Sequence, residues 1–236
     1  AFLSVTETAN GSIKLRLGGF YDKDSDGQFE AFLNDASTAI AKAPEATVIL
    51  DLRGNPGGID GYGVATIQLL SSKAFTVYDE ITTTADFDVD YVQTEIRADG
   101  VKVVRGADGL SETPAPKVTH KGPLILLVDQ RTGSTATDVA SHLDAFEEAI
   151  IIGQETTGAY NANSSGYLDL FTLKNSGAQL YLPQWRYTTS ATSSARVHRG
   201  VLPDIPFYPV PSDLLSEEDR MMETALILAG TLRDEP

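Results

Sequence analysis

The sequence predicts an α/β domain, in which helices cover a sheet. Residues 124–128 form an uninterrupted apolar run of strand length, as expected where both faces of a sheet are covered. The apolar run that begins at Val48 predicts another buried strand. Each run leads into a glycine-containing turn and then into a helical pattern. A chain of 236 residues fits one domain over residues 1–236 and can bury a sizeable core.

A strand and a helix precede the first buried run. Residues 12–20 alternate apolar and polar side chains, which is typical of a half-exposed strand. The following segment is amphipathic, and we expect it to form a helix with these residues on one face: Phe29, Phe32, Leu33, Ala36 and Ile40.

An acidic turn lies between this strand and this helix. The segment from Asp22 to Gly27 matches the first half of a calcium-binding EF-hand loop, with carboxylates at alternate positions. The twelfth position, where a bidentate Glu belongs, is Leu33. We therefore expect a solvated turn in which Asp26 caps the helix and no metal ion is bound, with calcium binding as the alternative.

The middle of the chain predicts a small β-rich annex. Residues 63–70 suit a short helix, and residues 74–105 contain several runs of strand type. Residues 106–119 are rich in Gly, Pro, Ser and acidic side chains, which indicates a surface loop. We therefore expect an annex and loop over residues 74–119 beside a cleft.

The last third predicts a hairpin and a terminal helix. Strand-like runs at 167–173 and 179–182 flank a turn, and residues 159–166 have the composition of a flexible polar loop. A further strand begins at Trp185. Residues 216–219 are expected to cap a helix that docks on the core through Met222, Ala225, Leu226 and Ala229.

Composition excludes several classes of function. A net charge of −15 argues against nucleic acids and anionic membrane surfaces as partners. No window has the apolar length of a membrane span. The chain has no cysteine, which excludes disulfides and thiol catalysis and leaves the cellular compartment open.

Ser134 is the first candidate for chemistry. It follows the second buried run and Gly133 and stands where a helix is expected to begin. Free N–H groups and the helix dipole at such a position favour a developing anion, which is how nucleophilic serines are often presented. A serine at this position can also be a simple N-cap. The local sequence leaves both interpretations open.

The Gly57-Gly58 pair is the second candidate, at the end of the first buried run. Without side chains, its backbone N–H groups can point into a cleft and form an oxyanion hole opposite a nucleophile. Taken alone, a Pro-Gly-Gly sequence is usually only a turn.

Four blocks of the sequence resemble the tail-specific (C-terminal processing) protease family of serine peptidases. The segment Asp51-Leu-Arg-Gly-Asn-Pro-Gly-Gly58 is similar to the family signature Asp-Leu-Arg-x-Asn-Pro-Gly-Gly, and residues 131–138 resemble its nucleophile block. Residues 152–158 and 200–205 resemble its Val-Gly-Glu-x-Thr-x-Gly strand and its Gly-Val-x-Pro-Asp block. Each motif is weak alone, but the four occur in the family's order and span nearly the whole chain.

The resemblance implies a fold, an activity and a location. It implies a core of the ClpP/crotonase-like ββα spiral type and a serine endopeptidase that acts on polypeptides and needs no cofactor. Ser134 would be the nucleophile, with N–H groups of Gly57 or Gly58 and of Thr135 as the oxyanion hole. The family usually works outside the cytoplasm, which implies a periplasmic or secreted protein. The stretch before residue 13 is too short for the family's peptide-binding PDZ module, so we expect none in this chain. An oligomer is compatible with the sequence but unsupported by it.

The general base is where the sequence departs from the family pattern. In one branch a lysine follows the Val-Gly-Glu-x-Thr strand, and here that position is Ala159. In the tricorn-type branch a histidine lies on the first strand, and here the matching position is Arg16, which we expect to face solvent. Tyr160 stands where the lysine motif has glycine, which favours natural divergence over a deliberate Lys-to-Ala substitution.

Other side chains are candidates for the proton acceptor. His198 lies close to the 200–205 block, and Glu155 can orient a partner or bind a substrate amine. His142 is two helical turns from Ser134 and is expected to point elsewhere, and His120 is expected at the surface. A carboxylate is a poor base for serine unless its pKa is raised.

Three further residues are expected to support the site. Asp51 and Arg53 share one face of a strand end, where an ion pair would fix the Gly57-Gly58 turn. Arg53 can alternatively hold the C-terminal carboxylate of a substrate. Asp138 matches the family's acidic residue after the nucleophile and is expected to orient the site.

The sequence thus leaves two functions open. The first is a serine endopeptidase. The second is a non-catalytic relative that binds peptides or apolar ligands in the same cleft.

Overall fold

A six-stranded sheet forms the core of the computed structural model, which describes residues 1–117, 120–147, 149–193, 196–214 and 218–234. The strand order is β1-β2-β3-β7-β8-β11, and β1 alone runs antiparallel to its neighbour. The bounds are β1 Leu3–Glu7, β2 Ile13–Leu17, β3 Val48–Asp51, β7 Leu124–Val128, β8 Ile150–Gly153 and β11 Ile205–Pro206. The two apolar runs of the sequence are the central strands β3 and β7.

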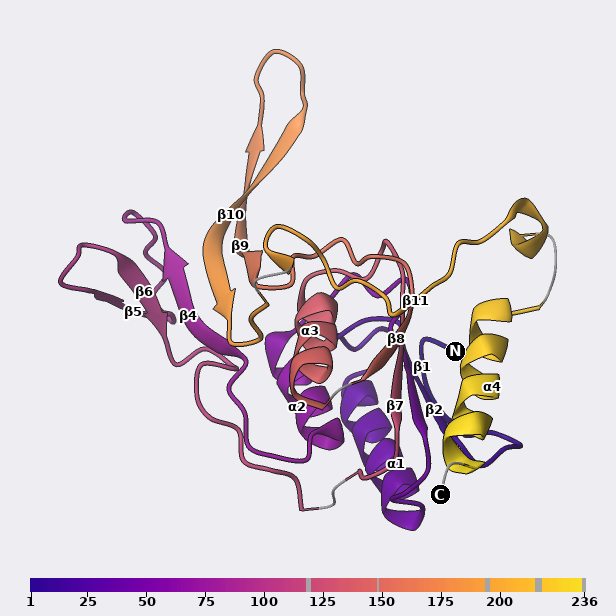
Figure 1. The fold of residues 1–236 in the computed structure, drawn as a ribbon. Helices are drawn as coiled ribbons and strands as arrows, with labels where there is room; N and C mark the ends of the chain where they lie inside the picture. Colours follow the sequence, from indigo (N-terminus) through magenta and orange to yellow (C-terminus); the bar gives the residue numbers. More distant parts are fainter. Residues whose placement is uncertain (118–119, 148, 194–195, 215–217, 235–236) are drawn as a thin grey trace.

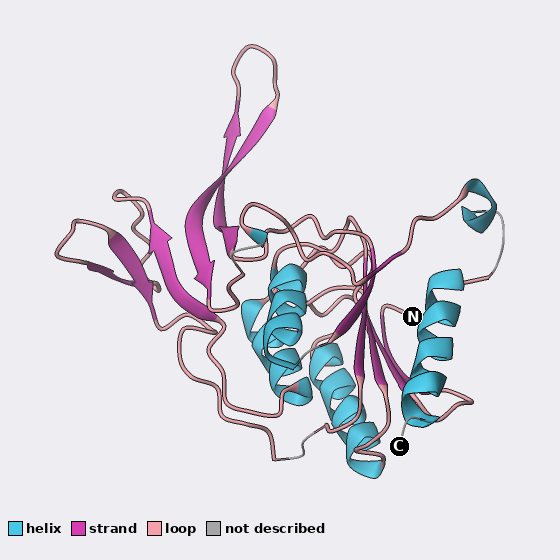
Figure 2. Cartoon of the chain, in the orientation of Figure 1, coloured by secondary structure: helices cyan, strands magenta, loops and turns pink. Residues whose placement is uncertain are grey.

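Helices cover both faces of this sheet, as the uninterrupted apolar runs require. In Figures 1 and 2, α1 (Gln28–Lys42), α2 (Asp60–Leu70) and α3 (Thr135–Glu147) lie on one side and α4 (Arg220–Asp234) lies on the other. Alternate residues of a strand point to opposite faces. Leu50 and Leu126 therefore pack into the core on the α1–α3 side, whereas Ile49, Ile125 and Leu127 pack against Met222, Ala225 and Ala229 of α4. The predicted α/β class is confirmed.

A second, antiparallel sheet flanks the core, with strand order β5-β6-β4-β10-β9. The bounds are β4 Tyr78–Thr83, β5 Gln93–Ile96, β6 Lys102–Arg105, β9 Ala162–Thr172 and β10 Gln179–Thr189. The strands expected within 74–119 are completed by the β9–β10 hairpin, because β10 pairs with β4 through partners such as Arg186 and Thr82. The far end of the hairpin projects away from the body of the molecule (Figure 1). Its near end, which the sequence suggested was a flexible loop, is the start of β9.

The residues that cap α1 and α4 can be compared with those predicted from the sequence. Asp22, not Asp26, caps α1, because its carboxylate accepts hydrogen bonds from the backbone N–H groups of Phe29 (2.7 Å) and Gly27 (3.1 Å). These bonds lower the pKa of Asp22 and direct its carboxylate to the helix start. At α4, Asp219 accepts from Met222 N at 3.1 Å, whereas Ser216 lies outside the described residues.

Candidate active site

Asn55 ties together the turns that follow β2, β3 and β7. Its side-chain amide donates to Leu17 O (3.1 Å), its Oδ1 accepts from Gly57 N (2.9 Å), and its backbone O accepts from Gly133 N (3.0 Å). Asn55 is fully buried, so these bonds are protected from competing water. The turn after β3 and the turn before α3 are therefore held against each other.

Ser134 lies at this junction in an uncommon backbone conformation. Its φ is +48°, in the left-handed region that a non-glycine residue seldom adopts, and the helix α3 begins at the next residue. A Cβ on Gly57 would lie 2.6 Å from Ser134 Cβ and 3.0 Å from Thr135 N. Glycine at 57 is what permits the β3 turn to approach the serine so closely.

Two backbone N–H groups near Ser134 are available to a ligand. Within the described residues, the structure records no internal acceptor for the N–H groups of Gly58 and Thr135. The N–H of Gly57 donates to Asn55, so the prediction of Gly57 as an oxyanion donor is wrong. Gly57 contributes close approach, and Gly58 and Thr135 retain the free donors.

The hydroxyl of Ser134 contacts a side chain that the sequence did not single out. Asn163 Nδ2, at the start of β9, lies 3.5 Å from Ser134 Oγ and 3.1 Å from Asp138 Oδ2. Tyr78 OH of β4 donates to the same Asp138 oxygen at 2.9 Å. Asp138 is 2% exposed, and burial raises its pKa to about 7. Both side-chain contacts of Asp138 come from the antiparallel sheet, and its expected role in orienting the site stays a prediction.

A second carboxyl group contacts the residue that follows Ser134. Asp60, at the start of α2, accepts hydrogen bonds from Thr135 Oγ1 (3.0 Å) and Tyr187 OH (3.1 Å). Burial raises the pKa of Asp60 as well. Tyr78 and Tyr187 pack against each other with ring centroids 4.8 Å apart, so they link the two carboxyl groups. No sequence motif predicts that Asp60, Tyr78, Tyr187 and Asn163 lie near Ser134, because tertiary folding alone brings them together.

Comparison with known proteins places this arrangement in a family. The model of Peptidase family S41 matches residues 13–207. The chain belongs to peptidase family S41. It is 25% identical over 207 residues to the chloroplastic C-terminal processing peptidase of Tetradesmus obliquus, a match that covers 86% of this chain and 38% of that protein.

Solved structures of S41 peptidases share the fold. The photosystem II D1 C-terminal processing protease matches with a TM-score of 0.53 and 20% identity over 91% of this chain and 51% of its own. Mature CPAF in complex with lactacystin matches with a TM-score of 0.66 and 14% identity over 99% of this chain and 55% of its own. The predicted ClpP/crotonase-like fold is confirmed. The chain spans between about two fifths and a little over half of the length of these relatives.

Within the described residues, neither side chain proposed from the sequence as proton acceptor forms a hydrogen bond with Ser134. Glu155 forms a two-pronged ion pair with Arg199 (2.8 and 2.7 Å) and accepts from Gly200 N (2.9 Å). The Arg199 guanidinium and this N–H lower the pKa of Glu155 to about 2, so it is a poor base. His198 is exposed in a turn at φ +63°, and within the described residues no hydrogen bond joins it to Ser134.

The remaining histidines are buried structural groups. His142 bonds to Asp138 O (2.8 Å) and Ser190 Oγ (3.0 Å), so it points away from the serine hydroxyl as expected. His120 is 6% exposed and bonds to Ala46 O at 3.0 Å, so its expected surface position is wrong. Burial lowers the pKa of both histidines.

The position of the family's lysine is an exposed turn. Ala159 is exposed, whereas the next residue, Tyr160, is buried and donates its hydroxyl to Asp144 at 2.7 Å. The Arg196 guanidinium pairs with Asp144 and lies 4.8 Å from the centre of the Tyr160 ring. Tyr160 is thus a buried, hydrogen-bonded part of this turn.

Asp51 and Arg53 do form the predicted pair, with contacts of 2.7 and 2.8 Å. Arg53 also contacts both carboxylate oxygens of Asp219 at 2.7 Å, and these carboxylates raise its pKa against the effect of burial. Arg16 donates to Asp51 O at 3.0 Å, so its expected solvent-facing position is wrong. The pair anchors α4, and the Gly57-Gly58 turn is held by Asn55 instead. Because two carboxylates fill the guanidinium fork, a substrate carboxylate would have to displace one.

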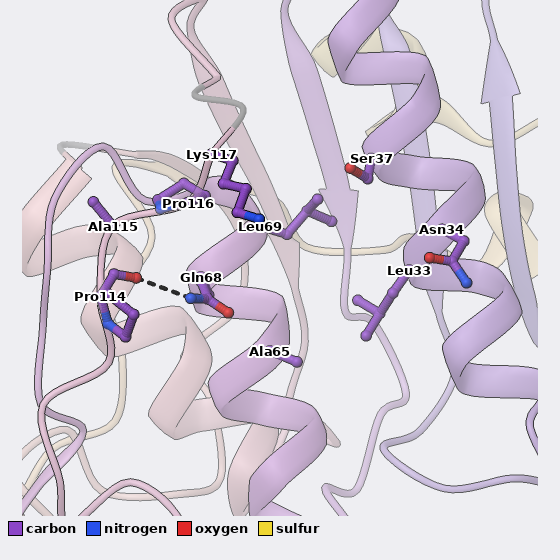
Figure 3. A pocket seen from close by; sticks show the side chains of 10 residues that line it. All are labelled: Leu33, Asn34, Ser37, Ala65, Gln68, Leu69, Pro114, Ala115, Pro116 and Lys117. Carbon is purple, nitrogen blue, oxygen red and sulfur yellow. Dashed lines mark hydrogen bonds between the residues drawn. The ribbon is translucent and has the colours of Figure 1, made fainter.

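A hollow of about 560 Å³ lies between α1, α2 and the 114–117 segment, apart from these residues (Figure 3). Leu33, Leu69 and Pro116 line it, and Gln68 donates to Pro114 O at 2.9 Å across it. None of its lining residues belongs to the candidate site.

Among the described residues, no helix combines the length and the apolar character that a membrane crossing requires. Those residues also contain no group of three His, Cys, Asp or Glu side chains that could hold a metal ion.

Proposed function

We propose that the protein is a serine endopeptidase in which Ser134 is the nucleophile. The observation that carries this proposal is the junction of Ser134 with the β3 turn. There Ser134, with a positive φ, directly precedes α3, and Gly57 lets the turn approach it closely. Membership of peptidase family S41 supports the reaction class and a polypeptide substrate. Free N–H groups of Gly58 and Thr135 next to the serine support an oxyanion hole.

The chemistry follows from these positions. Ser134 Oγ attacks the peptide carbonyl carbon and forms a tetrahedral intermediate. The N–H groups of Gly58 and Thr135 donate to its oxyanion, and the α3 dipole favours the same negative charge. Collapse of the intermediate breaks the C–N bond, and the leaving amine takes up the proton that the Ser134 hydroxyl lost on attack. Water then attacks the acyl-enzyme ester, which releases the acid and restores the hydroxyl of Ser134.

The second candidate is a non-catalytic peptide-binding relative. Two observations favour it: Ala159 replaces the lysine of the family pattern, and within the described residues no histidine or lysine nitrogen bonds to Ser134 Oγ. The strained serine and the glycine that faces it favour the peptidase, because neither is needed to bind a peptide.

Hydrolysis of casein and of C-terminally tagged peptides separates the two. We expect cleavage by the parent chain and none by Ser134→Ala. Cleavage by Ala159→Lys alone would indicate that the base was lost, and absence of cleavage in all three chains would favour the binding relative.

We further propose that the protein acts in the periplasm or outside the cell, because members of the family usually work outside the cytoplasm.

A further inference from the structure

The carboxyl group of Asp138 is buried beside Ser134 without a neutralising cation. Its Oδ2 accepts from Tyr78 OH and Asn163 Nδ2, and its Oδ1 is buried without a hydrogen-bond partner in the described part of the chain. None of the ion pairs recorded there involves Asp138. A buried carboxyl that is only partly satisfied costs stability, so its presence next to a nucleophile indicates a role in function.

The groups that face Asp138 come from every element packed against it. Tyr78 belongs to β4, Asn163 to β9 and Tyr187 to β10, and Asp60 belongs to α2. His142, on α3 itself, bonds to the backbone oxygen of Asp138 and not to its carboxyl group. Burial raises the pKa of both tyrosines, so near neutral pH they remain hydrogen-bond donors. The carboxyl groups are therefore the groups of this cluster that titrate below the tyrosines: burial raises the pKa of Asp138 to about 7 and also raises the pKa of Asp60.

We propose that Asp138 is a positioning residue that acts through Asn163 and holds Ser134 ready for attack when its own carboxylate is ionised. This inference rests on the proposed peptidase function. An ionised carboxylate only accepts hydrogen bonds, so it keeps the NH₂ end of Asn163 between itself and Ser134 Oγ. The amide then donates to the serine oxygen and favours the negative charge that develops on it.

Protonation of Asp138 reverses this arrangement. A protonated carboxyl donates a hydrogen bond, which favours the carbonyl end of Asn163 in the same place. Ser134 would then donate its hydrogen to the Asn163 oxygen and be held in an unreactive orientation. The reactivity of Ser134 should therefore rise with pH as Asp138 ionises.

The rate at which a fluorophosphonate probe labels Ser134, followed from pH 5 to 9, tests this inference. We expect the parent rate to rise through a midpoint near 7 and then level off. Asp138→Asn, of the same shape, should lose this midpoint and label about 10- to 100-fold more slowly at high pH, as expected for a lost hydrogen bond to a charged group. Tyr78→Phe removes a donor to the ionised carboxylate, so it should move the midpoint to higher pH.

Coupled variants show whether Asp138 acts through Asn163. Asn163→Ala should lose the midpoint too, and the double variant should be no slower than either single one. Asp169→Asn, an exposed carboxyl of the same strand β9, is the matched control and should keep both the rate and the midpoint. Circular dichroism checks that each variant is folded.

Two outcomes separate the failure of this inference from that of the proposed function. If labelling requires Ser134 but Asp138→Asn keeps the midpoint of the parent, the role of Asp138 is wrong and the peptidase stands. If no chain is labelled at Ser134 at any pH, the proposed function is wrong, and the inference is overturned with it.

Discussion

The two sides of Ser134 are built from different kinds of contact. On one side, the β3 turn meets the start of α3 through main-chain groups, glycine and hydrogen bonds of Asn55. On the other side, the side chains of Tyr78, Asn163 and Tyr187 reach in from the antiparallel sheet. The first side fixes where the serine is, and the second sets its electrostatic surroundings. Changes to the first side should act on the rate at all pH values, and changes to the second should alter its pH dependence.

Removal of the nucleophile should have the largest effect. Ser134→Ala is expected to lower peptide hydrolysis by about 10⁴-fold or more, because no covalent intermediate can form. The variant should fold as the parent does. Its stability should not rise, because alanine disfavours the positive φ of this position as serine does. A Ser134→Ala chain that hydrolyses peptides at the parent rate would contradict the assignment.

Crowding of the main-chain side should have the next largest effect. In Gly57→Ala, the new Cβ would lie 2.6 Å from Ser134 Cβ, so the serine must move, and we expect about a 10²-fold loss of hydrolysis. Gly177→Ala is the matched control. It also has a positive φ (+69°) but no atom within 4 Å of the new Cβ, so it carries the conformational cost without the clash. Equal activity of the two variants would show that close approach at Gly57 is unimportant.

Stability should depend on pH through the carboxyl side. The pKa of Asp138 is raised from 3.8 to about 7, so the folded state holds a proton that the unfolded state has lost between these pH values. Its contribution to stability is present below pH 4 and is lost as pH rises to 7. Asp138→Asn should therefore gain a few degrees in melting temperature over the parent between pH 5 and pH 8. If the melting temperatures of the two chains changed with pH in the same way across this range, the raised pKa of Asp138 would be contradicted.

Disruption of the Glu155 pair should have the smallest effect. Glu155→Gln weakens a surface ion pair with Arg199, so we expect a loss of stability below about 1 kcal/mol and hydrolysis within about twofold of the parent. His198→Asn should behave alike. A hundredfold loss of hydrolysis in either variant would return that residue to the catalytic site.

The contrast between the two sides also explains what the sequence could predict. Ser134, Thr135, Gly57 and Gly58 follow the ends of apolar strands, and the carboxyl ends of adjacent parallel strands meet at one edge of a sheet. The closeness of these residues in space therefore follows from the local sequence pattern and the strand order. The hydrogen bond of the Gly57 N–H could not be predicted in this way. Its acceptor is the side chain of Asn55, which folds back onto the same turn.

The carboxyl side could not be predicted because it depends on the packing of one sheet against another. Asn163 lies in a polar segment that has no strand pattern, yet it pairs with Tyr187 as part of β9. Glu155 was favoured by its place in a motif, but Arg199, 44 positions away, takes up its carboxylate. Long-range pairs of this kind leave no signal in a single sequence.

The most direct test of the peptidase assignment is the mass of the chain after treatment with a fluorophosphonate probe at pH 8. We predict one adduct per chain, located on the peptide that contains Ser134, and none in Ser134→Ala. An unmodified parent chain, or an adduct that persists in Ser134→Ala, would contradict the conclusion that Ser134 is an activated nucleophile.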